Sequence, residues 1–165
     1  MLIKIAFFTT CRGDMSILTP LIKKMYRDKK FKVMLFVGGT HMADEHGKTI
    51  NEIKSNKLKI TDTFDYLLNE DSSLSLTLSN SIAEIKIAYI FQKYDFDYVC
   101  IIGDRFERIA MIINSILNNK PIIHIHGGEI TSGVIDEQIR HMVTKASHLH
   151  FVICDKYKKN IKKLG

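Results

Sequence analysis

The sequence alternates short, predominantly apolar runs with longer segments in which apolar residues recur at three- and four-residue steps. The apolar runs lie at 2–8, 31–37, 98–102, 121–125 and 149–153, with a weaker one at 58–60. A run without polar alternation is typical of a strand that is buried on both faces, as in parallel sheets covered by helices. The sequence therefore predicts an α/β fold, in which a parallel sheet carries helices on both faces.

The intervening segments predict the helices. One contains Ile17, Leu18 and Ile22 at helical spacing, and others are expected at 49–54, 106–117, 136–146 and 155–164. The longest should begin at Asp71 or Ser72, because either side chain can cap a helix. Its apolar residues recur through Phe91, which predicts a long amphipathic helix. These residues are Leu74, Leu78, Ile82, Ile85 and Tyr89.

Length and charge limit the class of protein. The chain has 165 residues with 45% hydrophobic content, enough for one compact core, and it shows no repeat or interdomain linker, so we expect a single domain over 1–165. Lys and Arg number 24 against 18 Asp and Glu. This excess is dispersed and lacks interleaved aromatic residues, which argues against nucleic-acid binding but would steer an anionic small substrate.

The cysteines and the N-terminal run indicate where the protein works. Cys11, Cys100 and Cys154 are odd in number and far apart, so they predict neither a disulfide framework nor a zinc site. The N-terminal run has no cleavage-site pattern, and no uncharged stretch is long enough to span a bilayer. We therefore expect a soluble cytoplasmic protein without a membrane partner.

Polar loops follow the predicted strands, and ligands bind outside the carboxyl ends of strands in such sheets. In the first loop, Arg12 and nearby backbone N–H groups could hold a phosphate; alternatively, Arg12 pairs with Asp14 to close the loop. Cys11 has no base near it in the sequence that could activate it as a nucleophile, so we interpret it as a small loop residue. In the second loop two glycines allow a sharp turn, and His41 is either a hydrogen-bond donor to a ligand or a surface histidine without a role.

Two further loops carry most of the acidic and imidazole groups. Asp104 could cap the next helix or face the cleft, and Arg105 and Glu107 could form an ion pair. Strand alternation would put His124 and His126 on the same face, where they could bind a metal with Asp104 or Glu129. We expect no metal, because no further ligand motif is visible and the glycine pair 127–128 suits close approach of a substrate.

The helix expected at 136–146 adds two more candidate pairs. Asp136 should share a face with Arg140, and Glu137 with His141, because each pair is four residues apart. This arrangement is either ordinary helix pairing with Asp136 as the cap, or part of the site if the helix begins at the same sheet edge as Asp104.

Together these motifs resemble the hydrolysing UDP-N-acetylglucosamine 2-epimerases of sialic-acid and related nonulosonate synthesis. The resemblance spans nearly the whole chain and implies a Rossmann-like fold, similar to the N-terminal domain of a glycosyltransferase-B enzyme. The second, C-terminal domain, which grips most of the UDP in this family, would be absent from residues 1–165. The motifs that carry the resemblance are the segments 11–14, 39–41, 103–107, 124–129, 135–141 and 144–145.

The resemblance also implies an activity. The C2 proton of the sugar is lost as UDP departs, and water then adds to the resulting glycal to give N-acetylmannosamine, without a cofactor, nicotinamide or metal. Asp104 and Asp136 match acidic catalytic residues of the family, with Asp136 favoured as an acid/base. Arg12 matches a phosphate contact, and Arg105 and Arg140 match arginines that organise the site. His41 and His141 complete the expected substrate-binding set.

Two positions depart from the family pattern. Many relatives have glutamate where this chain has His126, and a second glutamate aligned with Glu129, so either residue could supply the acid/base. The first loop has Thr10-Cys11 where relatives usually have Gly-Ser or Gly-Thr. These differences change the expected proton-transfer and phosphate contacts.

Three functional hypotheses follow. The first is an epimerase domain that binds a UDP-sugar, pairs with a second copy or with the missing domain, and turns over little substrate alone. The second is a non-catalytic module that binds sugar nucleotides or another protein, which an exposed apolar surface would favour. The third is a metal-dependent hydrolase, which requires His124 and His126 to converge with Asp104 or Glu129.

Overall fold

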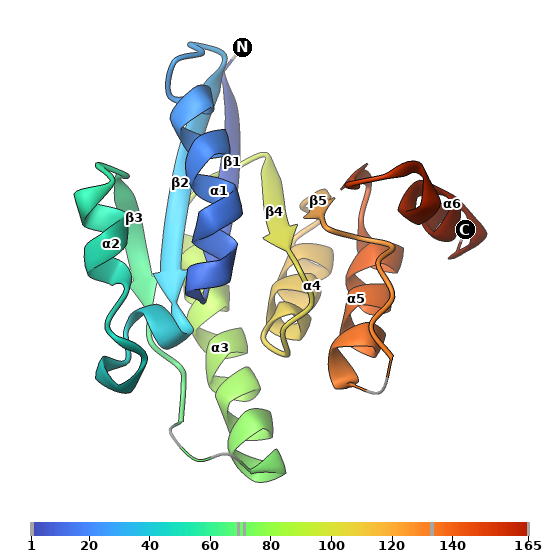
Figure 1. Cartoon of the computed structure of the whole chain (residues 1–165). Coiled ribbons are helices and arrows are strands. Elements are labelled where there is room, and N and C mark those ends of the chain that lie inside the picture. Colours follow the sequence, from blue (N-terminus) through green and yellow to red (C-terminus); the bar gives the residue numbers. More distant parts are fainter. Residues whose placement is uncertain (1, 69, 71, 133, 165) are drawn as a thin grey trace.

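The computed structural model describes residues 2–68, 70, 72–132 and 134–164 and contains one parallel sheet of six strands (Figure 1). The strand order is β3-β2-β1-β4-β5-β6. The predicted α/β fold with helices on both faces of a parallel sheet is confirmed. The strands are β1 (Ile3–Thr9), β2 (Phe31–Gly38), β3 (Ile60–Phe64), β4 (Tyr98–Ile102), β5 (Ile122–Ile125) and β6 (Leu149–Phe151).

The helices divide between the two faces of the sheet. Phe7 and neighbouring strand residues pack against α1 and α2 on one face, whereas Phe8 and its neighbours pack against α3, α4 and α5 on the other. Successive strand side chains point to opposite faces, so an apolar run supplies both cores at once. The helices are α1 (Arg12–Met25), α2 (Ile50–Ser55), α3 (Ser73–Lys93), α4 (Arg108–Leu117), α5 (Ile135–Ala146) and α6 (Asp155–Leu164).

The order of the strands fixes where a ligand can bind. From β1 the chain proceeds through β2 to β3 on one side, and β4, which pairs with the other side of β1, continues to β5 and β6. The loops after β1 and β4 therefore diverge to opposite faces, which opens a crevice at the carboxyl ends of these strands. Two short 3₁₀ turns, η1 (Gly39–His41) and η2 (Asp44–His46), follow β2 at the same edge.

Several element boundaries differ from the prediction. The weak strand expected at 58–60 is β3 at Ile60–Phe64, where the Thr61 hydroxyl oxygen accepts a hydrogen bond from the Leu35 amide of β2. Helix α4 begins two residues later than expected, at Arg108, and α5 begins one residue earlier, with Val134 at its cap position in place of Asp136. The sheet-facing apolar residues set these boundaries more strongly than the local capping signal.

Helix α3 confirms the predicted long helix, but the face that it buries differs from the predicted one. Ser72 caps it by accepting a hydrogen bond from the Ser75 amide at 3.1 Å, whereas Asp71, the other cap candidate, lies outside the described residues. The periodic apolar residues are mostly exposed, and the buried side carries serine and alanine as well as isoleucine. The face of α3 that the apolar periodicity assigns to the core is therefore largely exposed to solvent. The exposed members are Leu74, Leu78, Ile85 and Tyr89.

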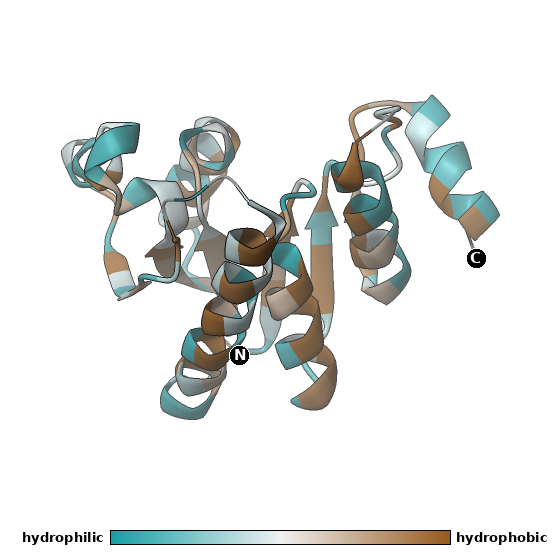
Figure 2. Cartoon of the chain, turned by 90° about the horizontal axis from the view of Figure 1, so that it is seen from below, coloured by the Kyte–Doolittle hydropathy of each residue, from teal (hydrophilic) through white to brown (hydrophobic). Residues whose placement is uncertain are grey.

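The hydropathy of the chain follows this architecture. The strands are predominantly apolar, and the C-terminal helix α6 is mostly hydrophilic (Figure 2). None of the described helices combines the length and the apolar character needed to cross a membrane.

The aromatic stack beneath α3 should dominate stability. Phe8 is fully buried and its ring lies 4.9 Å from that of Phe36. We expect Phe8→Ala to lower the free energy of unfolding by about 3–5 kcal/mol, because it removes buried area and leaves a cavity. Phe151→Ala, at a side chain that is 60% exposed, should cost less than about 1 kcal/mol. Urea denaturation of both variants measures this difference, and equal losses would contradict it.

Candidate functional site

A pocket of about 170 Å³ lies at the carboxyl edge of the sheet, between the loops that follow β1, β4 and β5. Its lining includes Asp104, His126, Glu129 and Arg140, four residues that the sequence predicts for the site. They come from the β4–α4 loop, the β5–α5 loop and α5, so only the folded sheet brings them together.

Arg140 holds Asp104 in place. Its guanidinium Nη2 donates to Asp104 and to the Thr131 hydroxyl at 2.9 Å, and its Nη1 donates to Glu137 at 3.2 Å. Arg140 is buried, and Glu107 occupies the cap position of α4, so the capping alternative for Asp104 is wrong. The Asp104 carboxylate instead faces the pocket beside a fixed positive charge.

His126 lies in a backbone conformation that is uncommon for a residue with a side chain. Strand β5 ends at Ile125, and His126 follows it with a φ of +66°, in the left-handed region. Its Nδ1 lies 2.6 Å from the Glu129 carboxylate, and both side chains are half-buried. This turn orients the imidazole and Glu129 into the pocket as a pair.

The prediction that His124 and His126 share a strand face is wrong. His124 is fully buried, with its Nε2 3.2 Å from the Gly103 carbonyl and its Nδ1 3.3 Å from the Thr144 hydroxyl. Burial lowers the pKa of His124 to about 4, so the ring is neutral at physiological pH. Among the described residues no group of three His, Cys, Asp or Glu side chains is placed to hold a metal ion.

The glycine pair after His126 serves packing within the protein. A Cβ on Gly127 would lie 2.7 Å from the His124 ring. Gly128 has a φ of +77°, and a Cβ there would lie 2.5 Å from the Tyr157 carbonyl of α6. These positions thus let the loop lie close to α6 and to the buried imidazole.

A charged network that the sequence did not predict lies buried below the pocket. Arg108, the first residue of α4, is fully buried and donates from Nη2 to both carboxylate oxygens of Asp14, at 2.9 and 2.8 Å. Its Nε donates to the Ile102 carbonyl at 2.9 Å, and its Nη1 to the Thr10 hydroxyl at 3.0 Å. Arg108 therefore joins the loop after β1 to the end of β4.

Glu107 extends this network on its other side. It is fully buried, accepts hydrogen bonds from the Thr10 hydroxyl and, at 2.9 Å, from Arg105 Nε, and lies 3.7 Å from Arg108 Nη1. The expected Arg105–Glu107 ion pair is confirmed, but at a buried carboxylate and not at the surface. Thr10 and Glu107 together tie the loop after β1 to the loop after β4.

The network keeps both carboxylates ionised. Burial alone would raise the pKa of Asp14 and of Glu107, but the Arg108 charge and the hydrogen bonds that each carboxylate accepts together outweigh burial and lower both. The same burial, together with the Glu107 charge, raises the pKa of Tyr66 well above its usual value. Burial and Asp14 also raise the pKa of Cys11, which keeps its thiol protonated. The sequence feature that could have revealed this network is Arg108, which lies at the start of α4 on the same helix face as the buried Met111 and Ser115.

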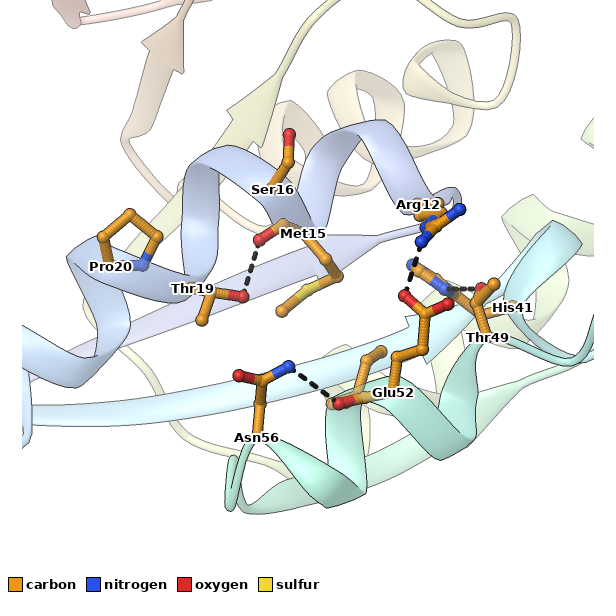
Figure 3. A pocket seen from close by; sticks show the side chains of 10 residues that line it. Arg12, Met15, Ser16, Thr19, Pro20, His41, Thr49, Glu52 and Asn56 are labelled. Atoms are coloured by element: carbon orange, nitrogen blue, oxygen red, sulfur yellow. Dashed lines mark hydrogen bonds and ion pairs between the residues drawn. The ribbon is translucent and has the colours of Figure 1, made fainter.

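Arg12 and His41 lie at a different cleft, of about 350 Å³, between α1 and α2 (Figure 3). Arg12 is exposed and pairs with Glu52 at 3.1 Å, so its predicted pairing with Asp14 is wrong. His41 is buried between the hydroxyls of Thr9 and Thr49, at 2.9 and 2.6 Å, so the surface alternative for it is also wrong. Burial lowers the pKa of His41.

Helix α5 carries the remaining candidates. Glu137 pairs with His141 at 3.1 Å as predicted, and it also accepts a hydrogen bond from the Thr131 amide at 2.8 Å. Arg140 pairs with Glu137 and Asp104 rather than with Asp136. In the described part of the chain, the half-buried Asp136 carboxylate has no hydrogen-bond or ion-pair partner.

A doubly wound parallel sheet with an acidic, arginine-clamped pocket at its switch point defines an α/β domain of the class whose ligands bind at the carboxyl edge of the sheet. The chain belongs to the UDP-N-acetylglucosamine 2-epimerase family, whose sequence model matches residues 23–165. The predicted family resemblance is thereby confirmed.

Named relatives refine this assignment. A GDP/UDP-N,N'-diacetylbacillosamine 2-epimerase (hydrolyzing) from Campylobacter jejuni is 36% identical over 98% of this chain, and a UDP-N,N'-diacetylbacillosamine 2-epimerase (hydrolyzing) from Legionella pneumophila is 30% identical over the whole of this chain. The chain spans 42% and 44% of these two relatives. It therefore corresponds to less than half of each.

Solved structures show the same fold. The UDP-N-acetylglucosamine 2-epimerase of Neisseria meningitidis bound to UDP-GlcNAc matches 99% of this chain and 43% of its own, with a TM-score of 0.82 and 16% identity. The enzyme of Methanocaldococcus jannaschii in complex with UDP-GlcNAc and UDP gives a TM-score of 0.78 at 17% identity, over 99% of this chain and 43% of its own. At this identity the likeness establishes the fold.

The buried arginine should be far more important for stability than the exposed one. Arg108→Met leaves Asp14 and Glu107 buried without their countercharge, so we expect a loss of about 3–5 kcal/mol at pH 7. Arg12→Met removes only an exposed pair and should cost at most about 1 kcal/mol.

The pH dependence provides an independent check on Arg108→Met. In the native protein the lowered pKa of each carboxylate stabilises the fold above its unfolded pKa, and this contribution is lost as pH falls through the native pKa. Without Arg108 burial raises both pKa values, so the stability deficit of the variant should shrink between pH 7 and pH 5. Urea titrations at both pH values measure this, and a deficit that grows would contradict the assignment.

His124 should make the protein acid-sensitive. Because its native pKa of about 4 lies below the ordinary value of 6.5, its contribution is complete above pH 6.5 and is lost as pH falls towards 4. We expect about 2–3 kcal/mol of stability to be lost from this group between pH 7 and pH 4.5. His124→Gln should remove this part of the pH dependence, whereas His46→Gln, at an exposed position, should retain it. Identical pH profiles for both variants would contradict the assignment.

Proposed function

We propose that this chain forms the N-terminal, acid/base-bearing part of a hydrolysing 2-epimerase that acts on a UDP-linked 2-acetamido sugar. The observation that carries the proposal is the convergence of Asp104, His126, Glu129 and Arg140 on one pocket at the switch point. The family membership and the names of the curated relatives support the reaction class.

The reaction requires a base near C2 of the sugar and a site in which the C1–O bond to the diphosphate can break. A base removes the C2 proton while the C1–O bond breaks and its electron pair leaves with UDP, which forms a glycal. The hydroxyl of a water molecule then adds to C1, and an acid returns a proton to C2 from the opposite side, which gives the epimeric free sugar and UDP. Two proton-transfer groups on different sides of the sugar therefore suffice.

The contacts of the acidic residues suggest how these roles are divided. Asp104 is neutralised by Arg140, which suits a residue that orients the sugar through hydrogen bonds. The Asp136 carboxylate has no partner in the described part of the chain, so we assign it one proton transfer. The His126–Glu129 pair takes the other, because an imidazole beside a carboxylate can both accept and donate a proton.

The basic residues are proposed to hold the rest of the substrate. Arg105 is partly exposed next to the pocket loop, and His141 is half-exposed on α5, where either can reach an anionic or hydroxyl group. Arg12 and His41 lie at the cleft between α1 and α2, so Arg12 can contact a phosphate only if its side chain leaves Glu52. His41 acts by holding the loop after β2.

Cellular context is part of the proposal. The cysteines are free among the described residues, which suits a reducing cytoplasm where sugar nucleotides are made. A polysialic acid biosynthesis protein from Escherichia coli is 33% identical over 98% of this chain. We therefore propose a role in sialic-acid-type surface polysaccharide synthesis. In the longer relatives a second segment completes the protein, and we propose that UDP binding depends on such a segment.

The decisive experiment measures UDP release, with the product sugar identified by NMR. UDP-N-acetylglucosamine and UDP-N,N'-diacetylbacillosamine are offered to the chain alone and to the chain joined to the remaining C-terminal part of the Campylobacter relative. We expect little turnover from the chain alone and epimerised sugar plus UDP from the joined protein. Asp104→Asn should lower the rate by about 100-fold or more, because it weakens the contact with Arg140 and misplaces the sugar.

Asp95→Asn is the matched control. Asp95 lies at the opposite edge of the sheet, where it pairs with Lys4 in solvent, so this change should leave the rate within about twofold. An unchanged rate in Asp104→Asn would overturn the role of the pocket. Absence of UDP release from a folded joined protein, when the intact relative is active in the same assay, would overturn the proposed reaction.

A non-catalytic binding module remains the second candidate because of one observation. Leu149, Phe151 and Ile153 on and after the edge strand β6 are between 47% and 62% exposed. Such an apolar edge suits association with another protein segment. Retained binding of UDP-sugar by the joined protein without turnover would favour this alternative.

A further inference from the structure

The C-terminal helix α6 is attached to the domain along one narrow face. None of its residues 155–164, all of which the structure describes, is buried. The partly covered positions are Tyr157, Asn160, Ile161 and Leu164, which recur at the three- and four-residue spacing of one helix face. The helix lies at the rim of the fold in Figure 1. It therefore has no core of its own, and its position depends on the few groups that this face touches.

That face lies against the loop between β5 and α5, which carries the proposed acid/base pair. The Asn160 side-chain amide donates from Nδ2 to the Gly128 carbonyl at 2.8 Å. A Cβ on Gly128 would lie 2.5 Å from the Tyr157 carbonyl oxygen and 2.9 Å from Ile161 Cγ1. Both distances are too short for a real Cβ, so the backbone of Gly128 rests directly on α6.

The loop has few other anchors near its turn. At its start the His126 amide donates to the Phe151 carbonyl at 3.1 Å, and at its end the Thr131 amide donates to Glu137 at 2.8 Å. Across 127–130, between these two anchors, the contact with Asn160 is the one backbone hydrogen bond that reaches a described residue outside the loop. The shape of the turn therefore depends on this contact.

The turn has an uncommon backbone shape that requires such support. His126 and Gly128 both have φ values in the left-handed region, +66° and +77°. A residue with a side chain keeps this conformation only where the surrounding structure determines it. The turn brings His126 Nδ1 to 2.6 Å from the Glu129 carboxylate, and the Asn160 contact lies between these two residues in the chain. Loss of that contact would free the backbone that joins them.

We propose that Asn160 is a positioning residue for the acid/base pair. Its hydrogen bond to Gly128 holds the turn against α6 and thereby sets the distance and angle between the His126 imidazole and the Glu129 carboxylate. Asn160 is not among the residues that line the pocket, so it acts on the pair through the loop backbone. Its effect on turnover rests on the proposed function, whereas its effect on the geometry of the pair does not.

The geometry is tested by imidazole NMR of the 165-residue chain. Long-range nitrogen–proton correlation spectra report the protonation and hydrogen bonding of each ring nitrogen, and His126→Gln identifies the His126 signals. Asn160→Leu keeps the size of the side chain but removes the donor, so we expect the Nδ1 signal to lose the signature of its hydrogen bond to Glu129. Asn51→Leu, the same change at an exposed position of α2, should leave that signal unchanged.

Gly128→Ala provides an independent way to move the loop away from α6, because its Cβ would meet the Tyr157 carbonyl. It should change the His126 signal in the same direction as Asn160→Leu. Circular dichroism and thermal unfolding establish that each variant is folded, and Asn160→Ser, which is too short to reach the Gly128 carbonyl, replaces Asn160→Leu if the latter is not. A His126 signal that stays the same in a folded Asn160 variant would overturn the proposal.

The effect on turnover is measured with the joined protein. We expect Asn160→Leu to lower kcat by about 10-fold or more and to change KM by less than about twofold, because a misplaced proton-transfer group slows the chemical step without removing a substrate contact. A merely structural role would lower thermal stability and leave kcat of the folded protein unchanged, and that result would overturn the proposal. If the wild-type joined protein releases no UDP while the His126 signal responds as expected, the proposed reaction fails and the positioning role stands.

Discussion

The bidentate contact between Arg108 and Asp14 is the interaction on which the site depends. A doubly wound sheet separates the loops after β1 and β4 at its switch point, because the chain leaves these strands towards opposite faces. Arg108 joins the two loops through Asp14, Thr10 and the Ile102 carbonyl. A fully buried guanidinium is tolerated there because carboxylates and carbonyl oxygens replace the water that it loses.

This buried layer allows the pocket above it to use charged groups for chemistry. Because the Arg108 network fixes the loop backbones, Asp104 can be held by Arg140 from a different helix, and His126 can occupy a left-handed turn. Backbone strain of this kind persists only where the surrounding structure determines it. The rigid layer and the strained turn together place an imidazole, two carboxylates and a guanidinium around one small cavity.

The sheet determines the two faces of α3 as well. The strands below it present large aromatic rings, such as Phe8 and Phe36, so the helix approaches with small residues including Ser79 and Ala83. Four of its large apolar residues, Leu74, Leu78, Ile85 and Tyr89, are then left on the outside. Burial of small residues thus explains both the close packing of the layer and the apolar outer side of α3, and it reverses the face that helical periodicity alone would assign to the core.

The sequence by itself determined the features that depend on residues close together in the chain, namely the strands, the helices and the loops that follow the strands. The predominantly apolar runs define the strands, the spacing of apolar residues defines the helices, and the polar residues after each strand mark the edge where Asp104, His126 and Glu129 lie. Tertiary structure alone decided the partners: Arg108 rather than Arg12 for Asp14, burial for His124 and His41, and the inner face of α3. Those choices depend on contacts between residues far apart in the chain, where the cost of burying a charge or a ring is set by what packs around it.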